Sequence, residues 1–402
     1  MKILLLGVGM QGKAALHDLV HSDQVSRIVA ADRDFDGLRS YVERRGYGDK
    51  VQCEPVDAAD RKSVDRLMEQ GIDVAIDLMP IVFVDEVVAY AVEYGVHLVN
   101  TFYASPEMKR LSDEARSKGI SILPEFGMDP GIDLVLLGEA VRSLDQVEEI
   151  VSYGAGFPEP AAADNPLGYK VTWTFEGVLK SYRRAGRVVR EGETVEIGET
   201  EIFGPEQIHE VEIEGLGRLE AFPNGDALRY AALLGLDLSE LRRMGRYVLR
   251  WPGHGAFWKK LVDLGFLDDE PVLVDGVPVD RKRFLATLLE PRLQYREGER
   301  DVVVVRIEAT GHRKGKRVRA RYQVIDYRDL ETGFTAMSRT VGYTASIGAQ
   351  MIGRGEIGKR GLLSPVSDVP YELFVRELAR RNIQVSSEIA ALDKGRSRRP
   401  PG

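Results

Sequence analysis

The chain begins with a short apolar strand and a glycine-rich turn, and this pair constrains its fold more than any other feature. Residues 3–6 are wholly apolar, as expected of a parallel strand covered on both faces. The turn Gly7-Val8-Gly9-Met10-Gln11-Gly12 matches the G-x-G-x-x-G pattern, and residues 11–20 have helical spacing. The three glycines permit a tight turn, close approach of a pyrophosphate and close packing of the helix on the strand. The sequence therefore predicts a unit that binds dinucleotide phosphates at a helix N-terminus.

The first third of the chain repeats this alternation of strands and helices. Six segments are expected to be strands: residues 3–6, 28–31, 51–56, 74–78, 97–99 and 120–123. The segments with helical spacing between them are residues 11–20, 37–45, 60–70, 84–94 and 106–118. Strands separated by crossovers predict a doubly wound parallel sheet, the Rossmann arrangement of the α/β class.

An acidic residue at the end of the second strand bears on the type of dinucleotide. Asp32 can accept both ribose hydroxyls of NAD and would repel the 2′-phosphate of NADP. NAD is therefore the expected cofactor. NADP is the alternative because Arg33 follows directly and could pair with that phosphate, although it could equally be a solvent-exposed loop side chain.

Ligands of such sheets bind beyond the carboxyl ends of the strands. The segment 125–133 follows the sixth strand and surrounds Asp129 with two glycines and a proline. By itself this sequence is more typical of a turn that caps a helix, but its place at the nicotinamide end of the crevice makes a substrate role an equal alternative. The residues expected to contact the cofactor are Gly7, Gly9, Met10, Gln11, Gly12, Asp32, Arg33, Asp57, Ala58, Leu78, Met79, Pro80, Phe102, Met128, Asp129 and Pro130.

From about residue 147 the pattern changes to mixed α and β. Strands or hairpins are expected at 147–153, 186–197, 208–222, 247–250, 302–308 and 317–327, and helices at 236–244, 257–264, 281–289 and 335–352. We expect a Rossmann domain over 1–131 and an α+β domain over 132–365 with a small helical insert at about 236–292. C-terminal helices within 366–392 could return to the first domain, and the tail 394–402 is expected to be disordered.

Composition excludes several classes of protein. The single cysteine, Cys53, excludes an internal disulfide and metal sites built from several thiolates, so no metal is expected. The net charge of −8 argues against nucleic acid as the main partner. The apolar run at the N-terminus is too short for a signal peptide, and no uncharged apolar stretch reaches 18 residues. We therefore expect a cytoplasmic protein without a membrane partner.

Several segments resemble the saccharopine dehydrogenase family in its glutamate-forming branch. They occur in one order along nearly the whole chain: residues 125–133, 164–170 with Trp173, 222–224, 249–254, 340–343 and 361–365. The lysine 6-dehydrogenases, a sister group, share most of them. The insert at 268–289 is more similar to that bacterial group than to the fungal enzymes.

This resemblance implies an oxidoreductase of lysine metabolism that acts on CH–NH groups. It would interconvert 2-aminoadipate 6-semialdehyde plus glutamate with saccharopine, and relatives pair as homodimers through the second domain. The alternatives are a lysine 6-dehydrogenase or related amine dehydrogenase, and a non-catalytic NAD-binding protein. By resemblance, the amino-acid substrate would contact Phe102, Tyr103, Asp129, Trp173, Thr174, Val248, Leu249, Arg250 and Arg229.

Within that set, the resemblance and the side-chain chemistry suggest particular roles. Arg250 would clamp a substrate carboxylate, with an interdomain salt bridge as the alternative. Asp129 and Tyr103 would handle protons at the reacting centre. His254 could compete for that role, but a histidine after Pro-Gly is more often structural.

Three positions depart from the family pattern. Gly225 stands where the family has an arginine after the Pro-Asn pair, with Arg229 as a possible substitute. Gly154 and Val248 replace a cysteine and a threonine of the fungal enzymes. Each change removes a polar group from the part of the pocket that would hold the glutamate moiety, so the smaller substrate lysine stays an alternative.

Overall fold

The computed structural model describes residues 1–392, which divide into two units. The first unit comprises residues 1–135 and 328–384, and the second comprises residues 136–327 with the segment that begins at Val385. The division falls within helix α6 (Ile132–Arg142). The expected disordered tail, residues 394–402, lies outside the described residues.

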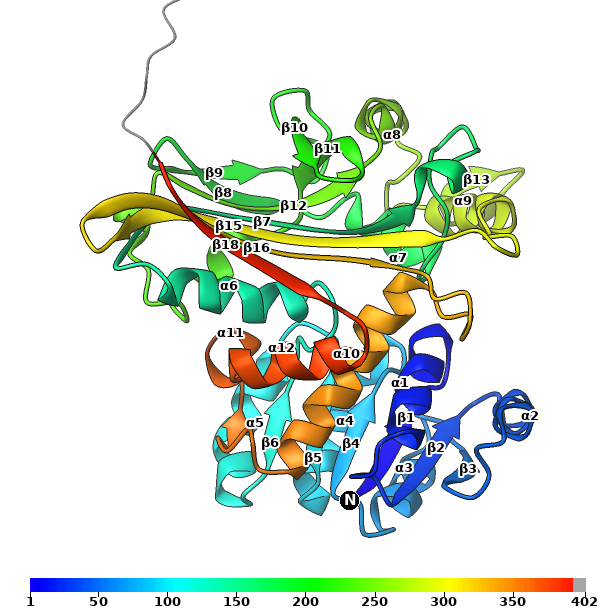
Figure 1. The fold of residues 1–402 in the computed structure, drawn as a ribbon. Coiled ribbons are helices and arrows are strands. Elements are labelled where there is room, and N and C mark those ends of the chain that lie inside the picture. The colour runs from blue at the N-terminus through cyan, green and yellow to red at the C-terminus, as the bar shows by residue number, and fades with distance from the viewer. Residues whose placement is uncertain (393–402) are drawn as a thin grey trace, which may run out of the picture. The chain divides into compact units, whose positions relative to one another are not determined.

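The first unit contains a seven-stranded parallel sheet (Figure 1). Its strands, in spatial order, are β17 (Gly361–Leu362), β6 (Ser121–Leu123), β5 (His97–Asn100), β4 (Val74–Asp77), β1 (Lys2–Leu6), β2 (Arg27–Asp32) and β3 (Val51–Pro55). The chain winds outward from β1 to β3 and then returns to β4 on the other side of β1. The doubly wound α/β arrangement is confirmed, and its order reverses between β1 and β4. The seventh strand, β17, was not predicted because a strand of two residues is too short to show an alternation of apolar and polar side chains.

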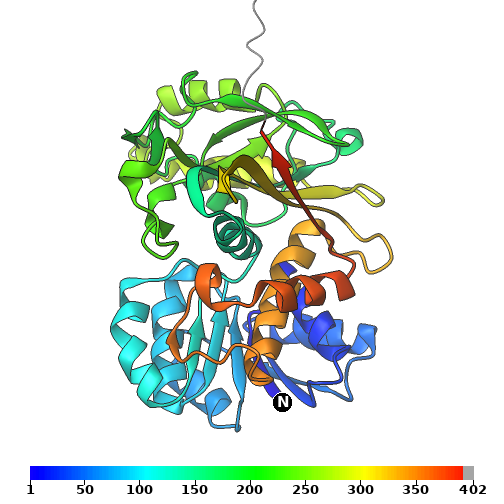
Figure 2. The same cartoon turned by 60° about the vertical axis from the view of Figure 1, so that its left-hand side comes forward.

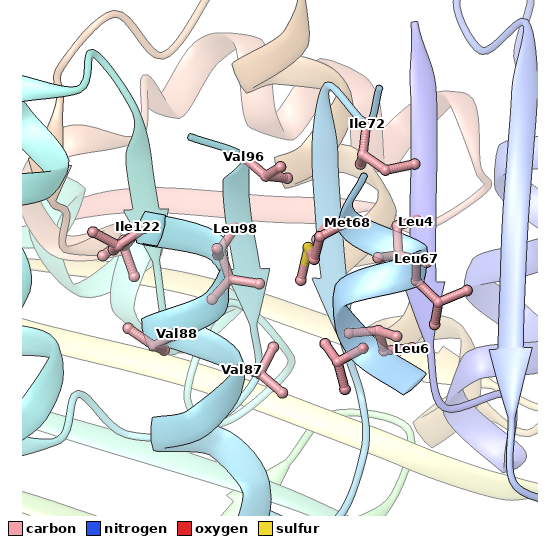
Figure 3. Packing of buried hydrophobic residues seen from close by; sticks show 14 of the residues in the cluster. Leu4, Leu6, Leu67, Met68, Ile72, Val87, Val88, Val96, Leu98 and Ile122 are labelled. Carbon is pink, nitrogen blue, oxygen red and sulfur yellow. The ribbon is translucent and has the colours of Figure 1, made fainter. Parts of the chain in front are cut away.

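Helices cover both faces of this sheet (Figure 2). They are α1 (Met10–Val20), α2 (Phe35–Arg45), α3 (Arg61–Met68), α4 (Val84–Tyr94), α5 (Pro106–Ser117), α10 (Ala336–Gly353), α11 (Pro365–Asp368) and α12 (Tyr371–Arg380), with the 3₁₀ turn η1 (Ile81–Phe83). One buried cluster joins the sheet to α3, α4 and α5. In Figure 3, Leu4 and Leu6 of β1 lie with Leu67 of α3, and Val87 of α4 lies near Leu98 of β5. Burial of such side chains supplies the main driving force for this layer.

Helix α10 belongs to the first unit, whereas the sequence analysis placed residues 335–352 in the second domain. The reason is its close packing along α1. A Cβ atom at Gly342 would overlap the backbone oxygen of Gln11 and would lie 2.7 Å from the backbone nitrogen of Ala15. The carboxylate of Asp18 on α1 strengthens this packing, because Ser346 donates a hydrogen bond of 2.6 Å to it.

The second unit contains a nine-stranded mixed sheet. Its path runs through β10 (His209–Ile213), β11 (Gly217–Pro223), β12 (Arg243–Arg250), β7 (Gln146–Pro158), β15 (Asp301–Arg313), β16 (Lys316–Tyr327) and β18 (Val385–Ala391), with β8 (Gly186–Arg190) pairing to β12 and to β9 (Glu193–Ile197). The other elements are α7 (Phe175–Ser181), α8 (His254–Asp263), α9 (Arg281–Leu289), the hairpin of β13 (Val272–Val274) and β14 (Val277–Val279), and the 3₁₀ turns η2 (Pro160–Ala162), η3 (Ala227–Tyr230), η4 (Leu238–Glu240) and η5 (Glu290–Arg292). The predicted hairpin over 302–327 is present as β15 and β16.

Two predicted helical segments are wrong. Residues 236–244 form only the short turn η4 before β12 begins at Arg243, because β12 pairs with β7, β8 and β11 and this ladder overrides the local apolar spacing. The segment 366–392 is helical only in α11 and α12. Its last part is strand β18, which pairs with β16 in the second unit. The expected helical insert at about 236–292 also differs, because it contains the strands β12, β13 and β14 as well as helices.

The α1–α10 contact predicts the effect of a single methyl group. Gly342→Ala should lower the free energy of unfolding by about 1–3 kcal/mol, because the added Cβ meets backbone atoms that cannot move aside without shifting a helix. Gly48→Ala is the matched control, since a Cβ there has nothing within 4 Å. Chemical denaturation of the two variants measures the difference, and equal stabilities would contradict this account of the contact.

Candidate dinucleotide and substrate sites

The glycine-rich turn after β1 is shaped by backbone contacts. Gly7 has a φ of +85°, and a Cβ there would lie 2.8 Å from the carbonyl group of Leu78. A Cβ at Gly12 would overlap the carbonyl oxygen of Gly7. A Cβ at Gly9, by contrast, has nothing within 4 Å, and no side chain caps the first turn of α1. Gly7 and Gly12 are therefore required by the fold, whereas Gly9 borders open space at a helix N-terminus, which fits the phosphates of a dinucleotide.

Asp32 is fixed at the end of β2, beside this turn. Its Oδ2 accepts a hydrogen bond of 2.6 Å from the backbone N–H of Val8, and its Oδ1 accepts one of 2.9 Å from the N–H of Asp34. Arg33 is exposed. The structure thus brings together, at the ends of the neighbouring strands β1 and β2, the glycine-rich turn, the carboxylate of Asp32 and the exposed side chain of Arg33. Asp57, expected as a further contact, is exposed after β3.

The turns after β4 and β5 are each held by a buried polar side chain that the sequence analysis did not select. Asp77 Oδ1 accepts a 3.0 Å hydrogen bond from the N–H of Met79, and Asn100 Oδ1 accepts one of 3.0 Å from the N–H of Phe102. Both side chains are almost completely buried. Burial raises the pKa of Asp77 to about 7. The signal that could have found them is a polar residue ending an apolar strand.

The loop after β6 packs on the turn after β5. The backbone N–H of Glu125 donates to the carbonyl of Phe102 at 2.8 Å, and that of Phe126 donates to the carbonyl of Asn100 at 2.9 Å. The structure therefore brings Phe102 next to the segment that carries Asp129. Asp129 is half-buried, and the peptide bond that joins it to Pro130 is cis.

In the second unit, Arg250 ends β12 inside an aromatic cluster. It is 5% exposed, and its guanidinium carbon lies 5.0 Å from the ring centroid of Tyr169. Its Nη1 donates a hydrogen bond of 2.8 Å to the carbonyl of Leu249, but its Nε has no partner. No carboxylate of the second unit, as far as the structure describes it, lies within ion-pair distance of this guanidinium. A buried and unpaired cation of this kind suits a carboxylate ligand.

Two neighbours of Arg250 are structural. Glu220 accepts backbone hydrogen bonds from Gly253, at 2.9 Å, and from Gly255 at the start of α8, and burial raises its pKa. His254 contacts the hydroxyl of Tyr182 at 2.7 Å. Burial and the nearby arginine hold the pKa of His254 well below its usual range, so its ring is neutral.

The other expected substrate residues differ in accessibility. Trp173 and Val248 are half-buried, Thr174 is exposed as the N-cap residue of α7, and Leu249 is fully buried in a core cluster. Arg229 is exposed and stacks on the ring of Tyr230 at 5.5 Å.

A different arginine lies against Gly225. A Cβ at Gly225 would be 3.0 Å from Cδ of Arg184, and Nη1 of Arg184 donates to the side-chain oxygen of Asn224 at 3.4 Å. Arg184 could not be predicted as a neighbour of Gly225 because it lies 41 positions earlier in the chain.

Two kinds of feature are absent from residues 1–392. No group of three or more His, Cys, Asp or Glu side chains that could hold a metal ion occurs there. No helix in the same range has both the length and the apolar character that crossing a membrane requires.

Known proteins are similar to this chain in both its N-terminal and its C-terminal part. A family model described as "Saccharopine dehydrogenase NADP binding domain" matches residues 3–123, and "Saccharopine dehydrogenase C-terminal domain" matches residues 127–383. The saccharopine dehydrogenase [NADP(+), L-glutamate-forming] of Pyricularia oryzae is 25% identical, over 97% of this chain and 99% of that protein. The corresponding protein of Saccharomyces cerevisiae is 26% identical, over 94% of this chain and 96% of its own length.

Two other comparisons concern a longer protein and a solved structure. The bovine mitochondrial alpha-aminoadipic semialdehyde synthase is 25% identical over 96% of this chain but only 48% of that longer protein. The solved apo structure of saccharopine dehydrogenase (L-Glu forming) from Saccharomyces cerevisiae superposes with a TM-score of 0.84 at 24% identity, covering 97% of this chain and 100% of that one. This last similarity supports the fold.

Because a Cβ at Gly9 would enter open space, a substitution there should weaken dinucleotide binding without destabilising the fold. Gly9→Ala should weaken dinucleotide binding by about tenfold or more, because its methyl group would occupy the space through which a phosphate approaches the backbone. Its unfolding midpoint should stay close to that of the unmodified protein. Fluorescence titration gives the dissociation constant and thermal unfolding the stability, with Gly48→Ala as the control. Unchanged binding, or a loss of stability, would contradict this role for Gly9.

Proposed function

The chain belongs to the saccharopine dehydrogenase family, and we propose that it interconverts saccharopine with 2-aminoadipate 6-semialdehyde and glutamate by means of a nicotinamide dinucleotide. The observation that carries this proposal is the end-to-end match. The relatives named L-glutamate-forming align over 94–97% of the chain and over nearly their own full length, so the likeness is not confined to the dinucleotide domain. The chain is accordingly an oxidoreductase that acts on CH–NH groups.

We propose that the dinucleotide is held by the turn from Gly7 to Gly12 and by Asp32. When bound, it supplies or accepts the hydride of the reaction. The relatives and the family model are named for NADP, which favours NADP over the NAD first expected. Two features are compatible with that choice: Asp32 already accepts two backbone N–H groups, and Arg33 is exposed and available to a 2′-phosphate.

The substrate side of the proposal rests on cations and proton-handling groups of this chain. Arg250 would bind a substrate carboxylate with the part of its guanidinium that has no partner. Asp129 and Tyr103, on the loops after β6 and β5, would exchange protons with the substrate amine. The homodimer and the cytoplasmic location that the resemblance implies remain predictions.

Arg184 bears on the choice between saccharopine and lysine. The glycine at position 225 removes the family's arginine, which favoured a substrate with fewer carboxylates. The side chain of Arg184 lies against Gly225 and supplies a cation to the same part of the second unit. This placement supports the glutamate-forming reaction over oxidation of lysine.

The reaction can be tested directly with the purified chain. We expect reduction of NADP⁺ when saccharopine is added, at a higher kcat/KM than with NAD⁺, and no reduction when lysine is added alone. In the reverse direction, oxidation of NADPH should require glutamate and the semialdehyde together. Reduction with lysine alone would establish the amine dehydrogenase alternative, and dinucleotide binding without turnover of either substrate would support the non-catalytic one.

The unpaired Arg250 predicts a selective defect. Arg250→Lys keeps the charge but loses the planar fork, so the KM for saccharopine should rise by about tenfold or more, consistent with about 1.5–3 kcal/mol for a charge-assisted hydrogen bond. The dissociation constant for the dinucleotide should not change, because the turn that would hold it belongs to the first unit. Arg218→Lys, at an exposed position of the second unit, is the control. Equal effects on substrate and dinucleotide would discredit the clamp.

A further inference from the structure

Asp77 is a buried carboxyl group that the proposed mechanism does not use. It is the last residue of β4, a strand whose four residues are all buried, and it is 1% exposed. One oxygen accepts the Met79 N–H described above, while Oδ2 has no hydrogen-bond partner. A buried carboxylate oxygen without a partner costs free energy, so its presence at a strand end suggests a role beyond folding.

Asn100 stands beside Asp77 with a complementary group. The parallel ladder of β4 and β5 pairs Asp77 with Asn100, which places both side chains on the same face of the sheet. The amide Nδ2 of Asn100 is also buried without a partner. A carboxylate oxygen and an amide nitrogen, each without a hydrogen-bond partner, therefore end neighbouring strands on one face of the sheet.

The strand order fixes which half of the dinucleotide would lie toward these residues. The phosphate-binding turn follows β1, and Asp32, the ribose ligand on the adenine side, follows β2. Strand β4 is the neighbour of β1 on the opposite side, and Leu6 of β1 pairs with Asp77. An extended dinucleotide with its phosphates at β1 and its adenosine at β2 therefore directs its nicotinamide half toward β4.

We propose that the carboxyl group of Asp77 sets the relative affinity of this site for the oxidised and the reduced dinucleotide. The oxidised nicotinamide ring carries a positive charge and the reduced ring is neutral. An ionised Asp77 attracts the first and has little effect on the second, in a buried environment where such an interaction is weakly screened. This inference rests on the dinucleotide part of the proposed function and not on the identity of the amine substrate.

The surroundings of Asp77 make this charge adjustable near neutral pH. Burial raises the pKa of the carboxyl to about 7, and the Met79 N–H opposes this shift. The neighbouring elements present no charged side chain to it among residues 1–392: β1 offers Leu6, β5 offers Asn100, and the buried cluster on this face contributes Met79, Val84 and Val87. Below this pKa the carboxyl is neutral, and above it the carboxylate favours the oxidised ring.

The test measures dissociation constants for NADP⁺ and NADPH between pH 6 and pH 8.5. We expect the ratio of the constants, reduced over oxidised, to rise about tenfold across this range, since a tenfold change corresponds to about 1.4 kcal/mol, which is within the range of one charge–charge interaction at an effective dielectric constant near 20. The 2′-phosphate is common to both forms, so its titration cancels in the ratio. Asp77→Asn should make the ratio nearly independent of pH, whereas Asp113→Asn, at a highly exposed carboxylate of α5, should behave like the unmodified protein.

A second measurement keeps the inference falsifiable if Asp77→Asn binds poorly. In the unmodified protein, binding of NADP⁺ near pH 7 should release more protons than binding of NADPH, seen as a stronger dependence of the binding enthalpy on the ionisation enthalpy of the buffer; the 2′-phosphate contributes equally to both. A pH-independent ratio in the unmodified protein would overturn the role of Asp77. Failure to bind either form would instead contradict the proposed dinucleotide site.

Discussion

The contact of Gly7 with Leu78 is the constraint on which the first unit depends. At this point the turn after β1 lies directly on the turn after β4, with no side chain between the two backbones. A second contact without side chains, Gly12 on the carbonyl of Gly7, brings α1 close to the end of β1. These contacts determine the height of the helix N-terminus above the sheet. Because α10 packs along α1 at Gly342, they also determine where α10 lies in the same unit.

The second unit keeps a cation, Arg250, buried without a carboxylate partner among its described residues. Arg250 is stabilised by the face of Tyr169 and by one backbone carbonyl, and Glu220, opposite it in the β11–β12 ladder, is occupied by the N-terminus of α8. Both carboxylate oxygens of Glu220 accept backbone N–H groups, and within the described part of the second unit this carboxylate forms no ion pair with Arg250. The result is a guanidinium with hydrogen-bonding capacity in reserve, as a site for an anionic amino acid requires.

Local sequence patterns predicted the elements that depend on hydrophobic periodicity and on glycine backbone conformation. The glycine turn, the first six strands of the parallel sheet and the long hairpin of β15 and β16 follow from such patterns. Side chains that matter through distant neighbours could not be predicted in this way. Arg184 reaches Gly225 only because the segment between α7 and β8 lies against the segment after β11, and β18 is a strand only because the edge of β16 is there to pair with it. The helical spacing of residues 335–352 predicted α10, but it did not indicate α1 as the helix against which α10 packs.

Asp32 and Asp77 have the same side chain but different surroundings at one edge of the sheet. Both end strands next to β1, yet Asp32 is partly exposed and has a hydrogen bond on each oxygen, whereas Asp77 is buried with one oxygen unpaired. The partial exposure of Asp32 and its two backbone N–H contacts suit recognition of a ribose. Burial raises the pKa of Asp77 to about 7, so its charge can respond to the charge of what binds beside it. The two strand ends would therefore separate identification of the dinucleotide from sensing of its redox state.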